Sequence, residues 1–127
     1  MIFHSNQDIG AYGEKLALKY LKKNGYKKVC LNYKTKHAEI DIIVKNKTHL
    51  VFVEVKTRES DSDFKRYGRP ARAVNAEKKR HIRYGVHDYL RNHTTELRIR
   101  CDIIEVYFDR SDPKKSKIVH IKNAFGE

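Results

Sequence analysis

The sequence is short of the residues and spacings that build zinc sites and disulfide frameworks. It has only two cysteines, Cys30 and Cys101, which lie far apart in the chain and form no CxxC pair. Its seven histidines show neither HxxxH nor HExxH spacing. We therefore expect no zinc site, and we expect two free thiols in a reducing cytosol, with a single disulfide as the alternative.

Long apolar segments are also missing. No stretch approaches the run of about 20 apolar residues that spans a bilayer as a helix. The first residues, MIFHSNQDIG, have neither the basic n-region nor the apolar h-region of a secretory signal. The sequence thus predicts a cytoplasmic protein without a membrane partner.

Acidic residues are scarce relative to basic ones, with 16 Asp and Glu against 28 Lys and Arg and a formal net charge of +12. Such an excess predicts attraction to polyanions. Nucleic acid is favoured over an anionic membrane, because no segment has the pattern of an amphipathic anchor. The length of 127 residues suffices for one core, so we expect a single domain over 1–127.

Hydrophobic periodicity predicts an α/β fold with its elements in the order αβββαββ. The first helix has apolar residues at helical spacing, and Gly25 follows it as a C-terminal stop. We expect helices over 6–24 and 75–92, strands over 29–33, 39–45, 49–57, 99–108 and 118–121, and a loop over 58–70. This order is typical of a central mixed sheet flanked by helices.

Two of the predicted strands carry acids inside apolar runs. Asp41 lies within the run IDIIV, and Glu54 lies within VFVEV and is followed two positions later by Lys56. Because side chains alternate between the two faces of a strand, Glu54 and Lys56 share one face. A tight turn over 46–48 would pair the strands as a hairpin and bring Asp41 alongside Glu54.

Carboxylates that converge inside a sheet repel each other and lose solvation, which destabilises the fold unless a cation compensates. Mg²⁺ is such a cation, since it takes carboxylate oxygens and keeps several waters. Lys56 beside the pair would hold a phosphate, and the set would then suit metal-assisted phosphodiester hydrolysis. The spacing alone is equally consistent with a cross-strand pair of an acid and a lysine on the sheet surface.

Motifs along nearly the whole chain carry a family resemblance. Asp41 followed by Glu54-Val55-Lys56 looks like the D…(D/E)xK core of restriction-endonuclease-like nucleases. The other matches are the G..GE..A..YL…G order over 10–25, Asn32-Tyr33, Glu39-Ile40-Asp41, FVEVKTR over 52–58, Gly68-x-Pro70, Ala73-Val74, Lys78, Tyr89-Leu90, His120-Ile121 and Ala124-Phe125. In these features the chain resembles the YraN-type family of small bacterial proteins, predicted endonucleases distantly similar to archaeal Holliday junction resolvases.

The resemblance implies a restriction-endonuclease-like fold with a site for Mg²⁺, Mn²⁺ being the alternative ion. Asp41 would be the central metal ligand, Glu54 the second, and the backbone carbonyl of Val55 a third. Lys56 would orient or activate the attacking water. Glu14, on the first helix, would complete the metal shell or bind water.

The chain departs from the family pattern at two places. Ala38 stands where the family usually has a glycine before Glu-Ile-Asp, which would tighten the approach of the backbone to a substrate. The loop between Arg58 and Gly68 is longer than usual, so substrate preferences that depend on this loop would differ.

A segment rich in basic residues begins before the second predicted helix and continues into its first turns. We expect this segment to contact nucleic-acid phosphates, with a solvated helix face as the alternative. Its basic residues are Lys65, Arg66, Arg69, Arg72, Lys78, Lys79, Arg80 and Arg83. Of the remaining candidates, Glu39 is expected to be a surface acid rather than a substitute ligand, and His120 to have a packing or turn role.

Together these features favour a Mg²⁺-dependent endonuclease that hydrolyses DNA phosphodiesters in DNA repair or recombination. The alternative is a non-catalytic module that binds branched DNA or a repair partner and has a vestigial acidic site. RNA is a further candidate substrate, because the sequence has no motif that reads the bases of either polymer. A resolvase-like role would favour a twofold homodimer that cuts two symmetric strands.

Overall fold

The computed structural model describes residues 6–59, 76–109 and 111–125. Within these ranges, two long helices, five strands and one 3₁₀ helix follow one another in the order αβββαββ, with the 3₁₀ turn before the last strand, so the predicted order is confirmed. The elements are α1 (Asn6–Lys23), β1 (Lys27–Lys34), β2 (Glu39–Lys45), β3 (His49–Glu59), α3 (Ala76–Asn92), β4 (Arg98–Phe108), η2 (Pro113–Lys115) and β5 (Lys117–Ile121).

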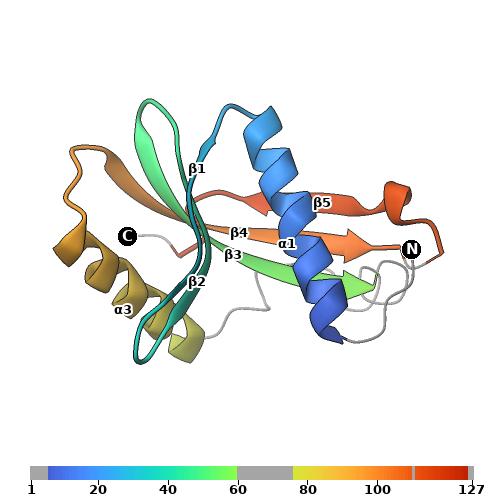
Figure 1. Cartoon of the computed structure of the whole chain (residues 1–127), viewed down its shortest axis with the longest axis horizontal. Helices are drawn as coiled ribbons and strands as arrows, with labels where there is room; N and C mark the ends of the chain where they lie inside the picture. The colour runs from blue at the N-terminus through green and yellow to red at the C-terminus, as the bar shows by residue number, and fades with distance from the viewer. Residues whose placement is uncertain (1–5, 60–75, 110, 126–127) are drawn as a thin grey trace.

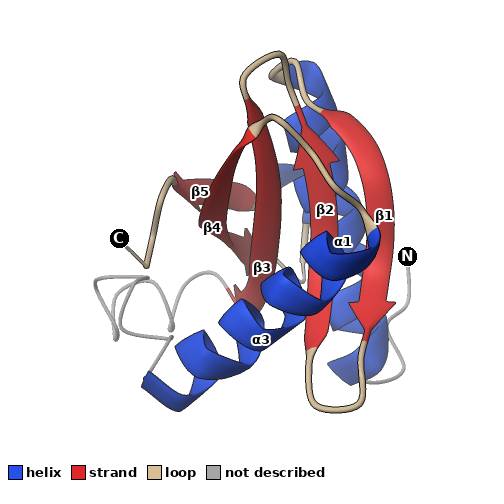
Figure 2. Cartoon of the chain, turned by 90° about the vertical axis from the view of Figure 1, so that its left-hand side faces the viewer, coloured by secondary structure: helices blue, strands red, loops and turns tan. Residues whose placement is uncertain are grey.

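The strands form one mixed sheet in the order β1-β2-β3-β4-β5. β3 and β4 run parallel, whereas the other neighbouring strands are antiparallel. Parallel neighbours need a long crossover, and here the crossover contains α3. The two helices cover opposite faces of the sheet (Figure 1), and in the turned view α3 crosses in front of the strands while α1 lies behind them (Figure 2). The predicted α/β class with a mixed sheet flanked by helices is confirmed.

One hydrophobic cluster lies between α1 and the sheet. Ala17 and Leu21 of α1 are fully buried and pack with apolar residues from β2, β3 and β4. Gly13 lets α1 approach β3 closely, because a Cβ at this position would overlap the hydroxyl of Thr57. The chain leaves α1 through Gly25, whose φ of 90° is the left-handed conformation that the predicted helix stop requires.

A second cluster lies between α3 and the opposite face of the sheet. Ile82, Val86 and Tyr89 of α3 pack on apolar residues of β2 and β3. Gly85 sits so close to β2 that a Cβ there would lie 3.0 Å from Ile40 Cδ1. This close packing fixes the distance at which α3 crosses the sheet, and with it the place of the first turn of α3 beside β3.

The structure differs from the prediction at the end of β3. Arg58 and Glu59 belong to the strand rather than to a loop, because they continue the parallel ladder opposite Tyr107 and Phe108 of β4. The many charges of this segment predicted a loop, and the pairing with β4 outweighs that local preference. The rest of the predicted loop, 60–70, lies outside the described residues.

Two expectations about composition can be checked in the structure. Cys30 and Cys101 are both free, which agrees with two reduced thiols and not with the alternative disulfide. Within the described ranges, none of the helices combines the length and the apolar character needed to cross a bilayer.

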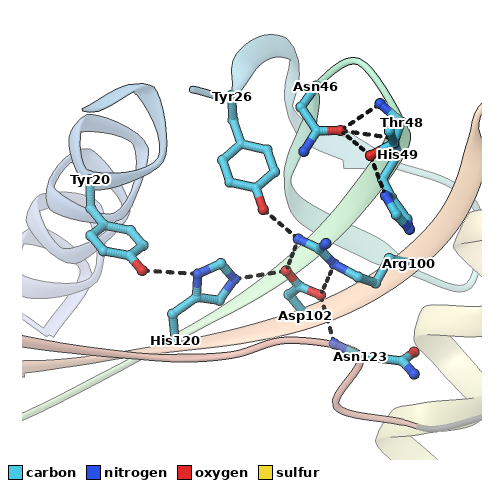
Figure 3. A network of polar contacts seen from close by, with 9 residues as sticks. All are labelled: Tyr20, Tyr26, Asn46, Thr48, His49, Arg100, Asp102, His120 and Asn123. Carbon is cyan, nitrogen blue, oxygen red and sulfur yellow. Dashed lines mark hydrogen bonds and ion pairs between the residues drawn. The ribbon is translucent and has the colours of Figure 1, made fainter. Parts of the chain in front are cut away.

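A polar cluster on the α1 side of the sheet joins several elements (Figure 3). Asp102 on β4 is fully buried and lies 2.9 Å from Arg100 Nε and 2.7 Å from His120 Nε2. The other ring nitrogen of His120 lies 3.1 Å from the Tyr20 hydroxyl on α1, and Arg100 donates a hydrogen bond of 2.6 Å to the Tyr26 hydroxyl. His120 thus has the packing role that the sequence predicted.

Candidate metal and nucleic-acid site

The hairpin of β2 and β3 places Asp41 and Glu54 side by side. The side chain of Asn46 closes the turn by accepting two backbone hydrogen bonds, of 2.9 and 2.8 Å (Figure 3). From the turn the ladder runs to the pair formed by Ile42 and Val53. Asp41 and Glu54 are the next residues along the two strands, so the structure brings them together as the spacing predicted.

These two carboxyl groups are buried and contact each other. Asp41 is 9% exposed and Glu54 is 6% exposed. Asp41 Oδ2 accepts a hydrogen bond of 2.8 Å from the backbone N–H of Val55. Burial, followed by a hydrogen bond and charge repulsion from Glu54, raises the pKa of Asp41 to about 8. In the absence of a metal ion, the pair therefore retains a proton at neutral pH.

Lys78, in the first turn of α3, brings an ammonium group to the same pair. Its Nζ lies 2.9 Å from Glu54 Oε2. Oε2 is buried, and the described residues give it no second partner of this kind. Burial opposes the charge of Lys78, but the contact with Glu54 outweighs it and raises the pKa of Lys78. The lysine therefore compensates the charge of Glu54, as a bound cation would.

The acids open into a cavity of about 450 Å³ between α1, the sheet and the start of α3. Its lining residues come from four elements of the chain, α1, β2, β3 and α3. They are Ile9, Gly10, Glu14, Asp41, Glu54, Val55, Lys56, Thr57, Arg58 and Lys78. The structure thus gathers in one cavity all the residues that the sequence predicted for catalysis and metal binding, and their roles remain predictions.

Glu14 reaches this cavity from α1. Burial and the negative charges of Glu39 and Glu54 raise the pKa of Glu14, while a side-chain hydrogen bond with Asn32 opposes the rise. Asn32 adopts a φ of 51°, which is uncommon for a residue with a side chain. Sequence reasoning noted Asn32 only as part of a motif and missed its contact with Glu14. Glu39 is exposed and pairs with Lys34 at 3.5 Å, as expected for a surface acid.

The oxygen atoms of the cavity fit a hard divalent cation. Among the residues that the structure describes, no three Asp, Glu, His or Cys side chains come close enough to hold a metal by themselves. Mg²⁺ does not need three, because it is commonly held by one or two carboxylates and keeps several waters. Glu54 Oε2 lies at this cavity beside the Lys78 ammonium and would be a ligand atom for such an ion. Asp41 and Glu54 would hold the metal, with the Val55 carbonyl and Glu14 as further oxygen donors.

The cationic side of the cavity is formed by β3 and by α3. Lys56 lines the cavity as predicted, and Arg58, which the sequence assigned to a loop, lines it as well. Arg58 Nε also lies 3.1 Å from Glu105 Oε2 on β4. Glu54, Lys56 and Arg58 are two residues apart along one strand, so the strand period would have found Arg58 if β3 had been extended to its true end.

The predicted basic surface is only partly brought together. Within the described residues, Lys78 is its one member that lines the cavity. Lys79 Nζ lies 6.0 Å from the centroid of the Phe125 ring, and Arg80 and Arg83 are exposed on α3. The members that lie outside the described residues are Lys65, Arg66, Arg69 and Arg72.

Comparison with known proteins assigns the chain to a family. The model of the family described as "Uncharacterised protein family UPF0102" matches residues 13–106, a range that includes the three acids and both lysines of the cavity. A UPF0102 protein of Alkaliphilus oremlandii is 43% identical over 123 residues, which cover 94% of this chain and 99% of that protein. A UPF0102 protein of Clostridium beijerinckii is 41% identical over 121 residues, 94% of each chain. The chain therefore belongs to the UPF0102 family, the YraN-type family whose motifs it carries.

Proposed function

We propose that this protein is a metal-dependent endonuclease that hydrolyses phosphodiester bonds of DNA. The observation that supports this most strongly is the contact between the buried carboxyl groups of Asp41 and Glu54 in a cavity that also contains Lys56. Two acids buried against each other destabilise a fold, and a divalent cation between them removes the repulsion. The net charge of +12 suits a polyanionic substrate.

Each side chain of the cavity has its own part in this proposal. Asp41 and Glu54 hold Mg²⁺ or Mn²⁺, and the carbonyl of Val55 and the carboxylate of Glu14 are further donors. When bound, the cation lowers the pKa of the attacking water and neutralises the charge that develops on phosphorus. Lys56 orients this water, and its ammonium charge stabilises the phosphate oxygens in the transition state.

The substrate is proposed to be DNA, in repair or recombination, because the motifs resemble those of resolvase-like nucleases. Arg58 lines the cavity beside Lys56 and adds positive charge where a phosphate would enter. RNA has the same phosphodiester linkage, so it is included as a competing substrate in the experiment below.

A specific observation supports a second candidate function, a DNA-binding module without catalysis. The ion pair between Lys78 and Glu54, at 2.9 Å, together with the raised pKa of Asp41, allows the acids to stay buried without a metal. A fold that has compensated its acids in this way could retain them after the loss of an activity. The basic chain would then hold DNA without cutting it.

The two functions are separated by a cleavage assay on linear, flapped, single-stranded and four-way DNA and on RNA, each with Mg²⁺, Mn²⁺ or EDTA. The proposed endonuclease cuts at least one DNA substrate with a divalent ion and not with EDTA. Asp41→Ala, Glu54→Ala and Lys56→Ala should each reduce the rate by at least about 100-fold while DNA binding persists. Glu96→Ala, which removes an exposed acid far along the chain from the site, is the matched control and should cut like the parent.

Equal cleavage by the parent and the Asp41→Ala variant would refute the assigned site. DNA binding by all variants, with no cleavage of any substrate under any metal condition, would support the binding module instead. Preference for RNA over every DNA substrate would keep the site and change the proposed polymer.

A further inference from the structure

We propose that Lys78 is a catalytic residue that exchanges places with the metal ion: its ammonium occupies Glu54 until the metal binds, and the displaced ammonium then contacts the substrate phosphate. This inference rests on the proposed function, since it requires the metal site. In this inference the contact of Lys78 with phosphate depends on the metal ion, unlike the general contact of a basic surface with DNA.

The two partners of this ion pair differ in burial. The side chain of Glu54 is 5% exposed, whereas the side chain of Lys78 is 40% exposed. Glu54 is held in the middle of β3, but the lysine has a long flexible chain that reaches the cavity from the first turn of α3. When a metal ion competes for the carboxylate, the lysine is therefore the partner that can move away.

A metal ion that binds Glu54 has to displace the ammonium group of Lys78. Nζ of Lys78 lies 2.9 Å from Glu54 Oε2, so a charge-assisted contact with one ammonium group holds this oxygen. A divalent ion bound to the same oxygen has twice the charge of an ammonium group and also interacts with Asp41, so it outcompetes the lysine.

Metal binding changes the balance of charge in the cavity. The two positive charges of a bound divalent ion balance the two carboxylates of Asp41 and Glu54. The displaced ammonium of Lys78 then loses Glu54 as its partner, and it lies in the cavity that Lys56, Arg58 and Glu14 also line. A phosphate group is the anion that a nuclease substrate would bring to this cavity.

Competition between Lys78 and the metal predicts that removal of the lysine tightens metal binding. We would titrate the DNA-free protein with Mn²⁺ and follow free Mn²⁺ by electron paramagnetic resonance. Lys78→Met should bind Mn²⁺ roughly three- to tenfold more tightly than the parent, since it loses a competing ion pair that is only partly exposed to solvent. Lys78→Arg keeps the charge and should stay close to the parent.

Lys79→Met is the matched control. It removes the same charge from the adjacent position, but the Lys79 ammonium lies beside the Phe125 ring and not beside the acids. A general effect of net charge on cation binding would shift Lys78→Met and Lys79→Met equally. Competition at Glu54 would shift only Lys78→Met.

The second measurement tests the contact with phosphate. Binding of a hydrolysis-resistant phosphorothioate DNA is measured by fluorescence anisotropy over a series of salt concentrations. With saturating Mn²⁺, the slope of log K against log salt should be smaller by about 0.9 in Lys78→Met than in the parent, the value for one lost phosphate contact. Without a divalent ion the two slopes should agree, because Lys78 is then engaged by Glu54.

The outcomes separate this inference from the proposed function. Mn²⁺ binding by the parent that is lost in Asp41→Asn, with no change in affinity in Lys78→Met, would overturn the exchange and leave the metal site standing. An equal gain in Lys78→Met and Lys79→Met, or equal salt slopes with Mn²⁺, would also overturn it. Absence of Mn²⁺ binding in the parent and in Lys78→Met alike would overturn the metal site and the inference together.

Discussion

Replacement of Asp102 by alanine tests how strongly the polar cluster on the α1 side holds the fold together. Asp102 is fully buried and accepts two hydrogen bonds of 2.9 Å from Arg100 and one of 2.9 Å from the backbone of Asn123, and it lies 2.7 Å from His120 Nε2. The Arg100 side chain is 13% exposed, so the alanine variant leaves a mostly buried cation without its counter-ion. Removal of one partner of a buried ion pair costs about 3–5 kcal/mol.

Such a loss would be a large part of the stability of the whole domain, which is typically about 5–15 kcal/mol. We expect the urea midpoint of Asp102→Ala to fall accordingly with an unchanged m-value, and the thermal midpoint to fall by about 10 °C or more. Circular dichroism in urea at neutral pH measures the free energy of unfolding. Glu96→Ala, at an exposed position, is the control and should stay within about 0.5 kcal/mol of the parent.

A double variant identifies the cause of the loss. Arg100→Met with Asp102→Leu removes both charges and leaves apolar groups of similar size. This variant should be more stable than Asp102→Ala, because the isolated buried cation is then absent. A loss below about 1 kcal/mol in Asp102→Ala, as for an exposed pair, would refute the reasoning. So would a double variant that is as unstable as the single one.

The remaining predictions concern packing, acid and metal. Gly13→Ala should lower the free energy of unfolding in a urea titration by about 1–3 kcal/mol, because the new Cβ would lie 3.0 Å from Thr57 Cβ and overlap its hydroxyl. Gly10→Ala is the control and should cause no loss, because nothing lies within 4 Å of the position of its Cβ. Although burial opposes it, the hydrogen bonds from an imidazole and a guanidinium hold the pKa of Asp102 below its usual range. The stability that Asp102 contributes through its charge is therefore present above its unfolded-state pKa of about 3.9, and it is lost as the pH falls through the lower folded-state pKa. In urea titrations from pH 7 to pH 2, the difference in the free energy of unfolding between the parent and Asp102→Asn should therefore shrink only in strong acid. Mn²⁺ at 100 times its dissociation constant should stabilise the parent by about 2.7 kcal/mol and raise its thermal midpoint. If the same Mn²⁺ concentration leaves the thermal midpoint of Asp41→Asn unchanged, the stabilisation comes from the proposed site.

The hairpin that carries the acids could be predicted because its determinants are local. The alternation along β2 and β3 and the turn residue Asn46 lie within one short stretch of sequence. They set a register that places Asp41 next to Glu54 without help from the rest of the chain. Sequence alone was therefore enough for this half of the site.

The cations of the site depend on contacts between distant segments, and the sequence was less informative about them. Lys78 reaches Glu54 only because α3 crosses β2 closely at Gly85. Arg58 reaches the cavity only because its strand continues in parallel with β4. Neither contact has a local signature, so Lys78 was predicted as one of several surface lysines and Arg58 as a loop residue.

The sequence pattern that pointed to the site is also not unique to it. The run CDIIEVYF of β4 contains two acids among apolar residues, Asp102 and Glu105, and both are fully buried. Each of them lies within 3.1 Å of an arginine side chain. Asp41, by contrast, has another carboxyl group, Glu54, as its buried neighbour. The acids of the site thus differ from those of β4 in lying against each other, although Glu54 also has a cationic partner in Lys78, and only the three-dimensional arrangement reveals this difference.

The most direct test of the central claim is anomalous diffraction from crystals of the DNA-free protein grown with Mn²⁺. The proposed site predicts an anomalous peak in contact with the carboxylates of both Asp41 and Glu54, with Lys78 displaced from Glu54, and no such peak in Asp41→Asn. A parent structure in which Mn²⁺ binds elsewhere, while Lys78 stays on Glu54 and no density lies between the two acids, would contradict the claim.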